Sequence, residues 1–148
     1  MVRGMERFRP AQILLVEDNP DDLAITMRAF QKSALVSRLI VARDGQEVLD
    51  LLCRAEASGS RPDLVLLDIN LPKVNGLDVL ATVRATDRVC TVPIVMLTAS
   101  GRREDIERSY ELGANSYIQK PIVFERMTRA LDVMRQYWFE VATLPPAS

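Results

Sequence analysis

Short apolar runs alternate along the chain with longer segments in which apolar residues recur every three or four positions. The runs have the length of strands and cover residues 13–16, 35–42, 64–67, 92–97 and 115–118. The longer segments have the period of helices and cover residues 21–32, 45–57, 76–86, 103–112 and 123–137. This alternation predicts βαβ units, and therefore an α/β fold around a doubly wound parallel sheet of five strands. Because Val, Ile and Leu dominate the runs, we expect strands that are buried on both faces.

The expected elements belong to a single domain. A length of 148 residues is within the usual range for one domain, and no repeat or low-complexity tract divides the chain. Asn19 before Pro20 is typical of a helix start, and Gly113 after the fourth helical segment is typical of a C-cap. We expect the domain over residues 12–137, an N-terminal extension over residues 1–11 and an aromatic tail over residues 138–148.

The composition excludes several kinds of chemistry. Nineteen Lys and Arg residues nearly balance twenty Asp and Glu residues, so we expect no general attraction to nucleic acid or to a membrane. The chain has no histidine, which excludes His-dependent catalytic triads, His-ligated zinc and a phosphohistidine on this chain. Cys53 and Cys90 form no CxxC motif, which favours a reducing compartment and the cytoplasm. We see no signal-peptide core and no apolar run of membrane-spanning length.

Polar side chains follow four of the five expected strands. Glu17 and Asp18 follow the first strand, Asp68 the third, Thr98 the fourth and Lys120 the fifth. In a doubly wound sheet the carboxyl ends of the strands share one edge, and ligands bind in the crevice there. We therefore expect three carboxylates, a hydroxyl and an ammonium to converge.

Each of these residues alone has an ordinary explanation as a helix cap, a strand end or a surface charge. Three carboxylates within a few ångströms, however, repel one another and must either raise their pKa values or find a cation. Mg²⁺ meets that need, because it binds one or two carboxylates together with water and phosphate oxygens. The cluster as a whole therefore favours a magnesium site.

Four segments resemble the motifs of the response regulator receiver domain of two-component signalling. They are Val16-Glu17-Asp18-Asn19, residues 66–76 (LLDINLPKVNG), Met96-Leu97-Thr98-Ala99 and Gln119-Lys120-Pro121. The resemblance covers about residues 12–137 and implies a flavodoxin-like fold with strand order 2-1-3-4-5. It also implies that the chain is a signalling switch rather than an enzyme. Such a switch accepts a phosphoryl group from a partner histidine kinase in a reaction that requires Mg²⁺.

The resemblance assigns a role to each residue of the cluster. Asp68 matches the aspartate that becomes phosphorylated, and Asp18 matches a direct Mg²⁺ ligand. Glu17 matches the acid that reaches the metal through water, and Asn70 matches the residue whose backbone carbonyl is a further ligand. Asp68 is itself expected among the metal ligands.

The resemblance also implies the residues that sense the phosphoryl group. Lys120 matches the lysine that pairs first with the acceptor carboxylate and then with the phosphoryl oxygens. Thr98 and Tyr117 match the hydroxyl and the aromatic ring that change conformation together. The Lys120–Pro121 peptide matches one that is cis in the family, and Gly76 is expected at positive φ in the turn after Pro72.

The C-terminal end predicts how the signal leaves the domain. Only about ten residues follow Tyr137, so we expect a stand-alone receiver that acts by protein contact. Phe139, Val141 and Leu144 lie beyond the apolar stripe of the last helix and are expected to be exposed in a monomer. We therefore expect a homodimer through the fourth and fifth helices, the fifth strand and the tail, with Trp138 and Phe139 in the interface. The alternative is that the tail folds back over its own sheet.

A narrower resemblance is to the small receivers that work with phytochrome-like histidine kinases. It rests on residues 17–22, on residues 70–76 and on the tail with Trp138 and Phe139. It implies a bacteriophytochrome as the partner kinase.

Three alternatives belong to other classes of protein. A phosphatase of the haloacid dehalogenase type also uses an aspartate and Mg²⁺, but it needs an acid at the position that Asn70 occupies. A flavodoxin-like electron carrier needs a phosphate-binding loop after the first strand, where this chain has carboxylates. A pseudo-receiver that works without phosphorylation would lack Asp68, Asp18 or Lys120, and all three are present.

Overall fold

The computed structural model describes residues 11–32, 37–58, 61–86, 91–121 and 123–146. In chain order these residues form β1 (Ala11–Val16), α2 (Pro20–Lys32), β2 (Ser37–Ala42), α3 (Gly45–Ser58), β3 (Leu64–Leu67), α4 (Gly76–Arg84), β4 (Ile94–Thr98), α5 (Arg103–Glu111), β5 (Ser116–Gln119), α6 (Phe124–Arg135) and the π-helical segment η1 (Gln136–Val141).

The strands form one parallel sheet in the order β2-β1-β3-β4-β5. This confirms the α/β class and the strand order implied by the resemblance. In the register of the sheet, Ile13 of β1 is aligned with Leu39 of β2 on one side and with Leu64 of β3 on the other. From β1 the chain first adds β2 on one side and then β3, β4 and β5 on the other, so the strand order reverses between β1 and β3. In such a sheet the crevice for a ligand lies at the carboxyl ends of these two strands.

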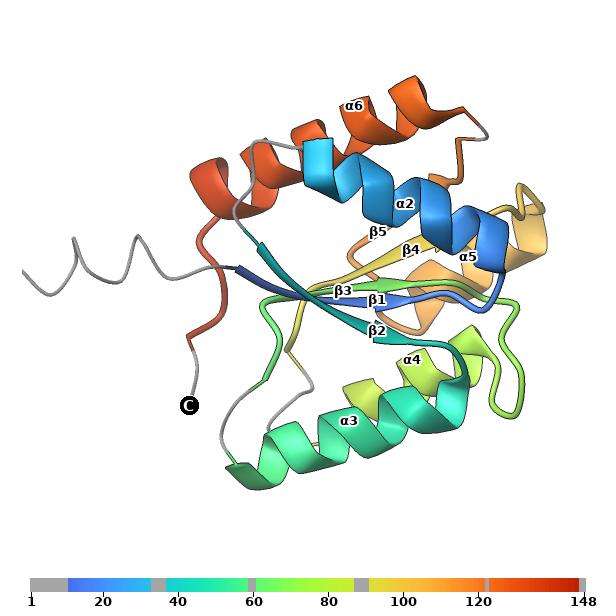
Figure 1. Cartoon of the computed structure of the whole chain (residues 1–148). Helices are drawn as coiled ribbons and strands as arrows, with labels where there is room; N and C mark the ends of the chain where they lie inside the picture. Colours follow the sequence, from blue (N-terminus) through green and yellow to red (C-terminus); the bar gives the residue numbers. More distant parts are fainter. Residues whose placement is uncertain (1–10, 33–36, 59–60, 87–90, 122, 147–148) are drawn as a thin grey trace, which may run out of the picture.

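Helices cover both faces of the sheet, as Figure 1 shows, with α2 and α6 on one face and α3 and α4 on the other. Strand β3 contributes to both layers because successive side chains of a strand point to opposite faces. Val65 and Leu67 pack in the cluster under α3 and α4, whereas Leu64 and Leu66 pack in the cluster under α2 and α6. All four are buried, as the near-continuous apolar run predicts.

The expected elements differ from the observed ones mainly at their ends. Helix α4 ends at Arg84 instead of residue 86, and β4 covers Ile94–Thr98 instead of residues 92–97. Residues 35–36 of the expected second strand, residues 1–10 and Cys90 lie outside the described residues. Cys53 is exposed and makes no disulfide. Among the described residues, no helix combines the length and the apolar composition needed to cross a membrane.

The C-terminal segment packs against the domain more closely than the sequence predicts. Trp138 and Phe139 are half-buried against the cluster under α2 and α6. The expectation that Phe139 and Leu144 are exposed is wrong, since Leu144 is also half-buried, whereas Val141 is 74% exposed as expected. The reason is the π-helical turn, which changes the spacing of side chains after α6 and turns Phe139 toward the core.

Arg61 holds the end of the tail. Its guanidinium donates hydrogen bonds to the carbonyl oxygens of Pro145 (3.2 Å) and Pro146 (2.8 Å) and to the hydroxyl of Thr91 (2.9 Å). Arg61 precedes β3 and Thr91 precedes β4, so the tail is attached at the amino-terminal edge of the sheet. This is the edge opposite to the expected site.

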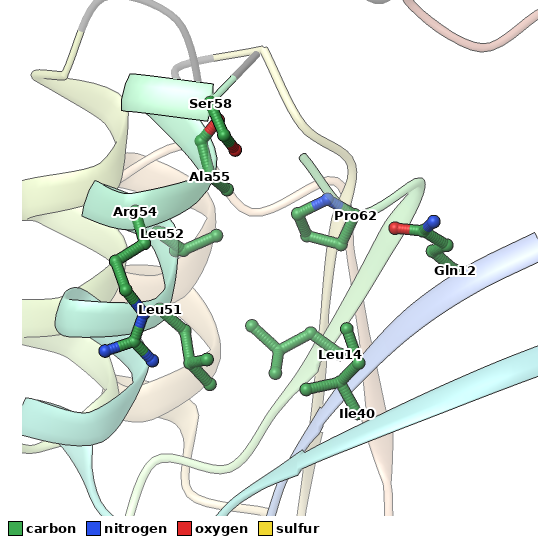
Figure 2. Close-up of a pocket in the computed structure, with 9 residues that line it drawn as sticks. All are labelled: Gln12, Leu14, Ile40, Leu51, Leu52, Arg54, Ala55, Ser58 and Pro62. Atoms are coloured by element: carbon green, nitrogen blue, oxygen red, sulfur yellow. The ribbon is translucent and has the colours of Figure 1, made fainter. Parts of the chain in front are cut away.

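A cavity of about 280 Å³ lies between α3 and the strands β1 and β2, and its lining is mostly apolar (Figure 2). Leu14, Ile40 and Leu52 line it together with Gln12 from the start of β1 and Pro62 from the segment before β3. The cavity therefore opens near the amino-terminal edge and is separate from the polar residues at the carboxyl ends of the strands.

The packing of the tail makes a prediction about stability. Phe139→Ala should lower the free energy of unfolding by about 1–3 kcal/mol, less than the 3–5 kcal/mol of a fully buried Phe, because the ring is only partly buried. Val141→Ala should change it by less than about 0.5 kcal/mol, since this side chain is mostly exposed. Urea unfolding measures both. Equal effects of the two substitutions would show that Phe139 does not pack on the core.

Candidate functional site

The carboxyl ends of the strands bring together the side chains that the sequence predicts there. Glu17 follows β1, Asp68 follows β3, Thr98 ends β4 and Lys120 follows β5. Glu17, Asp68 and Thr98 are buried, whereas Asp18 is exposed at the mouth of the site. A buried carboxylate needs a partner, and the structure supplies one.

The partner is the ammonium group of Lys120, whose side chain is only 6% exposed. Its Nζ lies 2.8 Å from Oδ2 of Asp68 and 3.0 Å from Oδ2 of Asp22, and it also pairs with Oε1 of Glu17. A lysine ammonium has three N–H donors, so this one is fully used by three carboxylates.

Asp22 is the member of this cluster that sequence reasoning missed. The sequence pattern indicates only an acid in the first turn of a helix. Asn19 caps that helix, since its Oδ1 accepts hydrogen bonds from the backbone N–H groups of Asp21 (2.9 Å) and Asp22 (3.1 Å). The cap fixes the first turn of α2 so that the Asp22 carboxylate reaches Lys120, a contact between residues far apart in the sequence.

Burial and neighbouring charges both shift the pKa values of Glu17 and Lys120, but with a different balance for each residue. Burial raises the pKa of Glu17 above its usual value, and the hydrogen bonds from Lys120 and from the Asn19 N–H oppose the rise only in part. Burial by itself would lower the pKa of Lys120, but the hydrogen bonds to Asp68 and Glu17 outweigh it and raise the pKa. Lys120 is therefore firmly protonated.

The loop after β3 is closed by backbone hydrogen bonds. The N–H of Asn70 donates to Oδ1 of Asp68 (3.3 Å), and the N–H of Gly76 donates to the carbonyl oxygen of Ile69 (2.7 Å). Gly76 is required for close approach, because a Cβ there would collide with the backbone carbonyl of Asp68. The expectation of a positive φ at Gly76 is wrong: Lys73 has it, at 67°. Gly113 has φ 102°, as expected of a C-cap glycine.

Glu17, Asp18 and Asp68 fit a divalent cation. Each offers one carboxylate oxygen, and these oxygens all lie within 4.8 Å of one another. Hard oxygen donors of this kind suit Mg²⁺ and Mn²⁺. Asp18 is exposed, so an ion can approach the group from solvent.

Thr98 and Tyr117 lie beside the cluster. The hydroxyl of Thr98 is completely buried and has no hydrogen-bond partner among the residues that the structure describes. A buried hydroxyl without a hydrogen-bond partner costs free energy unless a bound group supplies that partner. The hydroxyl of Tyr117 donates to the carbonyl oxygen of Ser100 (2.7 Å), in the loop after β4, and burial raises its pKa. The Lys120–Pro121 peptide is not cis, since the described residues contain no cis peptide bond.

Comparison with known proteins identifies the family to which this fold belongs. Residues 13–132 match the response regulator receiver domain. The probable methanogenesis regulatory protein FilR2 of Methanothrix harundinacea is 40% identical over 135 residues, covering 90% of this chain and 87% of that protein. The response regulator Rcp1 of Synechocystis is 36% identical, covering 93% and 95%.

Solved structures agree with the sequence comparison. The phosphorylated cyanobacterial phytochrome response regulator RcpA has a TM-score of 0.85 and is 35% identical, covering 93% of this chain and 99% of that chain. The Mn²⁺-bound form of Rcp1 has a TM-score of 0.81 and covers 93% and 100%. The chain belongs to the response regulator receiver domain family. Proteins of this family are signalling switches that pair with histidine kinases, so the phosphatase and electron-carrier alternatives lose their support.

The buried charges predict a pH-dependent role for Lys120. Lys120→Met leaves Glu17 and Asp68 buried without their cation, so it should destabilise the fold by about 3–5 kcal/mol near neutral pH. The pKa of Glu17 is already above its ordinary value and should rise further in this variant, because two interactions that lower it are lost. When the pKa of a carboxyl group is higher in the folded protein than in the unfolded chain, the group stabilises the fold at any pH below its unfolded pKa. This stabilisation is lost as the pH rises through the pKa of the folded protein.

The loss of stability should therefore be larger at about pH 7.5 than at about pH 4.5. Urea unfolding of both proteins at the two pH values measures it. Lys32→Met, which removes an exposed lysine from α2, is the matched control and should have little effect at either pH. A loss for Lys120→Met that grows on acidification would contradict the prediction.

Proposed function

We propose that this receiver domain accepts a phosphoryl group on Asp68 from a phosphohistidine of a partner kinase, in a reaction that depends on Mg²⁺. The observation that carries the proposal is the arrangement around the Asp68 carboxylate. It lies at the end of β3, 2.8 Å from the ammonium of Lys120, beside the carboxylates of Glu17 and Asp18 and near the unsatisfied hydroxyl of Thr98. The family match supports the same role.

In this reaction a carboxylate oxygen of Asp68 attacks phosphorus, a P–O bond forms and the P–N bond of the phosphohistidine breaks. The imidazole of the donor leaves and takes up a proton, and the product is an aspartyl phosphate. Phosphoryl transfer needs positioning and compensation of charge more than covalent help from the protein. Lys120 supplies a positive charge at the acceptor, and the Thr98 hydroxyl supplies a hydrogen-bond donor that has no other partner among the described residues.

The metal would be held by Asp18 and Asp68, by the backbone carbonyl of Asn70 and, through water, by Glu17. When bound, it would neutralise negative charge on the carboxylates and on the phosphoryl oxygens. The cluster of carboxylate oxygens supports this proposal, and so does the Mn²⁺-bound form of the relative Rcp1.

We propose that Thr98 and Tyr117 carry the signal to the surface. A phosphoryl group on Asp68 would offer acceptors to the Thr98 hydroxyl, and that contact exists only in the phosphorylated state. A ligand shifts a conformational equilibrium only by such a difference in contacts. The hydroxyl of Tyr117, in β5, donates a hydrogen bond to the carbonyl oxygen of Ser100, in the loop that joins Thr98 to α5. A shift of this loop would therefore change the packing of α5 and β5.

The partner we propose is a histidine kinase related to phytochromes. The support is the likeness to RcpA, which is described as a cyanobacterial phytochrome response regulator. FilR2, a probable regulator of methanogenesis, is more identical to this chain than Rcp1 is. AtBRR, which is described as a bacteriophytochrome response regulator, is 41% identical to this chain, so relatives of comparable identity support the light stimulus as well.

We also propose a homodimer through α5, β5, α6 and the C-terminal segment. Three apolar side chains on α6 and η1 are exposed at a spacing of four residues: Val133 (57%), Tyr137 (52%) and Val141 (74%). A twofold interface buries such a stripe on both copies. We keep Trp138 and Phe139 in the proposed interface because they neighbour this stripe, although their rings pack partly on the core of their own chain.

Phosphorylation of Asp68 can be tested with a small phosphodonor. Wild-type protein incubated with acetyl phosphate and Mg²⁺ should gain the mass of one phosphoryl group, and Asp68→Asn should gain none, since the nucleophilic carboxylate is lost. Intact-protein mass spectrometry measures both, and Asp63→Asn is the control because Asp63 lies at the other end of β3. A wild-type protein that is never labelled would favour the pseudo-receiver alternative, and labelled Asp68→Asn would remove Asp68 as the acceptor.

The dimer can be tested without disturbing the core. Val133→Glu combined with Val141→Glu places charge in the exposed stripe and should convert the protein from dimer to monomer, as measured by analytical ultracentrifugation. Cys53→Glu changes an exposed residue of α3, on the other face of the sheet, and should leave the dimer intact. A wild-type monomer at tens of micromolar, or a double variant that still dimerises, would reject this surface.

A further inference from the structure

The loop that follows Asp68 contains a strained turn. Lys73 has φ 67°, and the N–H of Val74 donates to the carbonyl oxygen of Pro72 at 2.8 Å. A hydrogen bond between residues i and i+2 around a residue with positive φ is a γ-turn of the rare kind. A residue with a Cβ adopts this conformation only when its surroundings enforce it, and such enforced turns are concentrated at functional sites.

The enforcing contacts come from the loop between β2 and α3. The N–H of Gly45 donates to the same Pro72 oxygen at 3.2 Å, and the Asp44 carboxylate lies 3.6 Å from the ammonium of Lys73. Gly45 packs so closely that a Cβ there would collide with the backbone carbonyl of Val74. The two loops are therefore in backbone contact, and only glycine fits at position 45.

The β2–α3 loop is itself fixed, so it can act as a support. Oδ1 of Asp44 caps α3 by accepting from the N–H of Glu47 at 2.8 Å, while its other oxygen faces Lys73. Helix α3 is anchored on the sheet by Val48 and Leu52, which are buried in the core. A displacement of the turn would therefore require a movement of a packed helix or the loss of its cap.

The supported turn lies in the same short loop as Asn70. The carbonyl oxygen of Ile69 accepts from the N–H groups of Leu71 (3.1 Å) and Gly76 (2.7 Å), which closes the loop at its base. Asn70 lies between this base and the turn at Lys73. Its N–H is held by the Asp68 carboxylate, so its position depends on both ends of the loop.

We propose that Gly45 and Asp44 are positioning residues for the divalent cation: they hold the Pro72–Val74 turn and thereby fix the Asn70 carbonyl and the Asp68 carboxylate for metal binding. This inference rests on the metal site of the proposed function. Neither residue is a ligand. Both act through the backbone of the loop that carries two of the proposed ligands.

The test is a titration of the metal-free protein with Mg²⁺ and Mn²⁺ by calorimetry, at a temperature where circular dichroism shows each variant to be folded. Gly45→Ala pushes the turn away and should weaken the affinity for both ions by about tenfold or more, the size of effect that groups orienting metal ligands have elsewhere. Asp44→Asn keeps the cap on α3 but loses the ion pair with Lys73. It should weaken the affinity by about two- to fivefold.

Gly113→Ala is the matched control. It replaces a glycine that needs positive φ, at the end of α5, so it strains the fold without touching the loop after Asp68. Its metal affinity should equal that of the wild type even if its melting temperature falls.

The results that would contradict the metal site differ from the results that would contradict the role of Gly45 and Asp44. If the wild type binds neither ion, or if Asp18→Ala binds as tightly as the wild type, the metal site of the proposed function is wrong. If the wild type binds and Asp18→Ala does not, wild-type affinity in Gly45→Ala overturns the present inference. Should Gly45→Ala not fold, wild-type affinity in Asp44→Asn overturns it in the same way.

Discussion

The ion cluster around Lys120 is the constraint on which the site depends. Two buried carboxylates and a third that is partly exposed share a single ammonium group at the carboxyl edge of the sheet. Without that cation, burial would raise the pKa of Glu17 further, and the carboxylates of Glu17 and Asp68 would repel each other without compensation. The same lysine is tied to the sheet through its backbone, since its N–H donates to the carbonyl oxygen of Thr98 at 2.7 Å. The cluster therefore joins the ends of β1, β3, β4 and β5 to the first turn of α2.

Such a cluster can exchange its ion-pair partners, because three carboxylates share the ammonium group of Lys120. Under the proposed function, a divalent ion would compensate the charge of the carboxylates in place of the ammonium group, and a phosphoryl group on Asp68 would offer Lys120 new oxygens. The total charge to be compensated changes at each step; Lys120 and Thr98 are already in place for it, and the divalent ion would come from solution. The buried hydroxyl of Thr98 adds a donor that gains a partner only when a new acceptor arrives.

The features that could be predicted from the sequence are those that follow from local pattern and from the geometry of parallel sheets. The ends of the strands converge in any doubly wound sheet, so Glu17, Asp68, Thr98 and Lys120 could be placed together from the sequence alone. Asp22 could not, because its contact with Lys120 depends on how α2 lies against the sheet. The positive φ at Lys73 was also missed, since no local rule favours it there and it depends on the contact with Gly45.

The same dependence on packing explains how a charge change at Lys120 could reach the surface of α6. This helix begins four residues after Lys120, and its first residue, Phe124, lies under the guanidinium of Arg28 from α2, 4.7 Å from the centre of the ring. Asp22 with Lys120 and Arg28 with Phe124 are therefore two polar contacts between α2 and the stretch from Lys120 to the start of α6, beside the apolar packing of the two helices. If Lys120 leaves Asp22, the first of these contacts is lost, while the Arg28–Phe124 contact and the apolar packing between α2 and α6 remain. That helix continues into η1 with the exposed Tyr137, so α6 and η1 connect the neighbourhood of Lys120 with the proposed dimer surface.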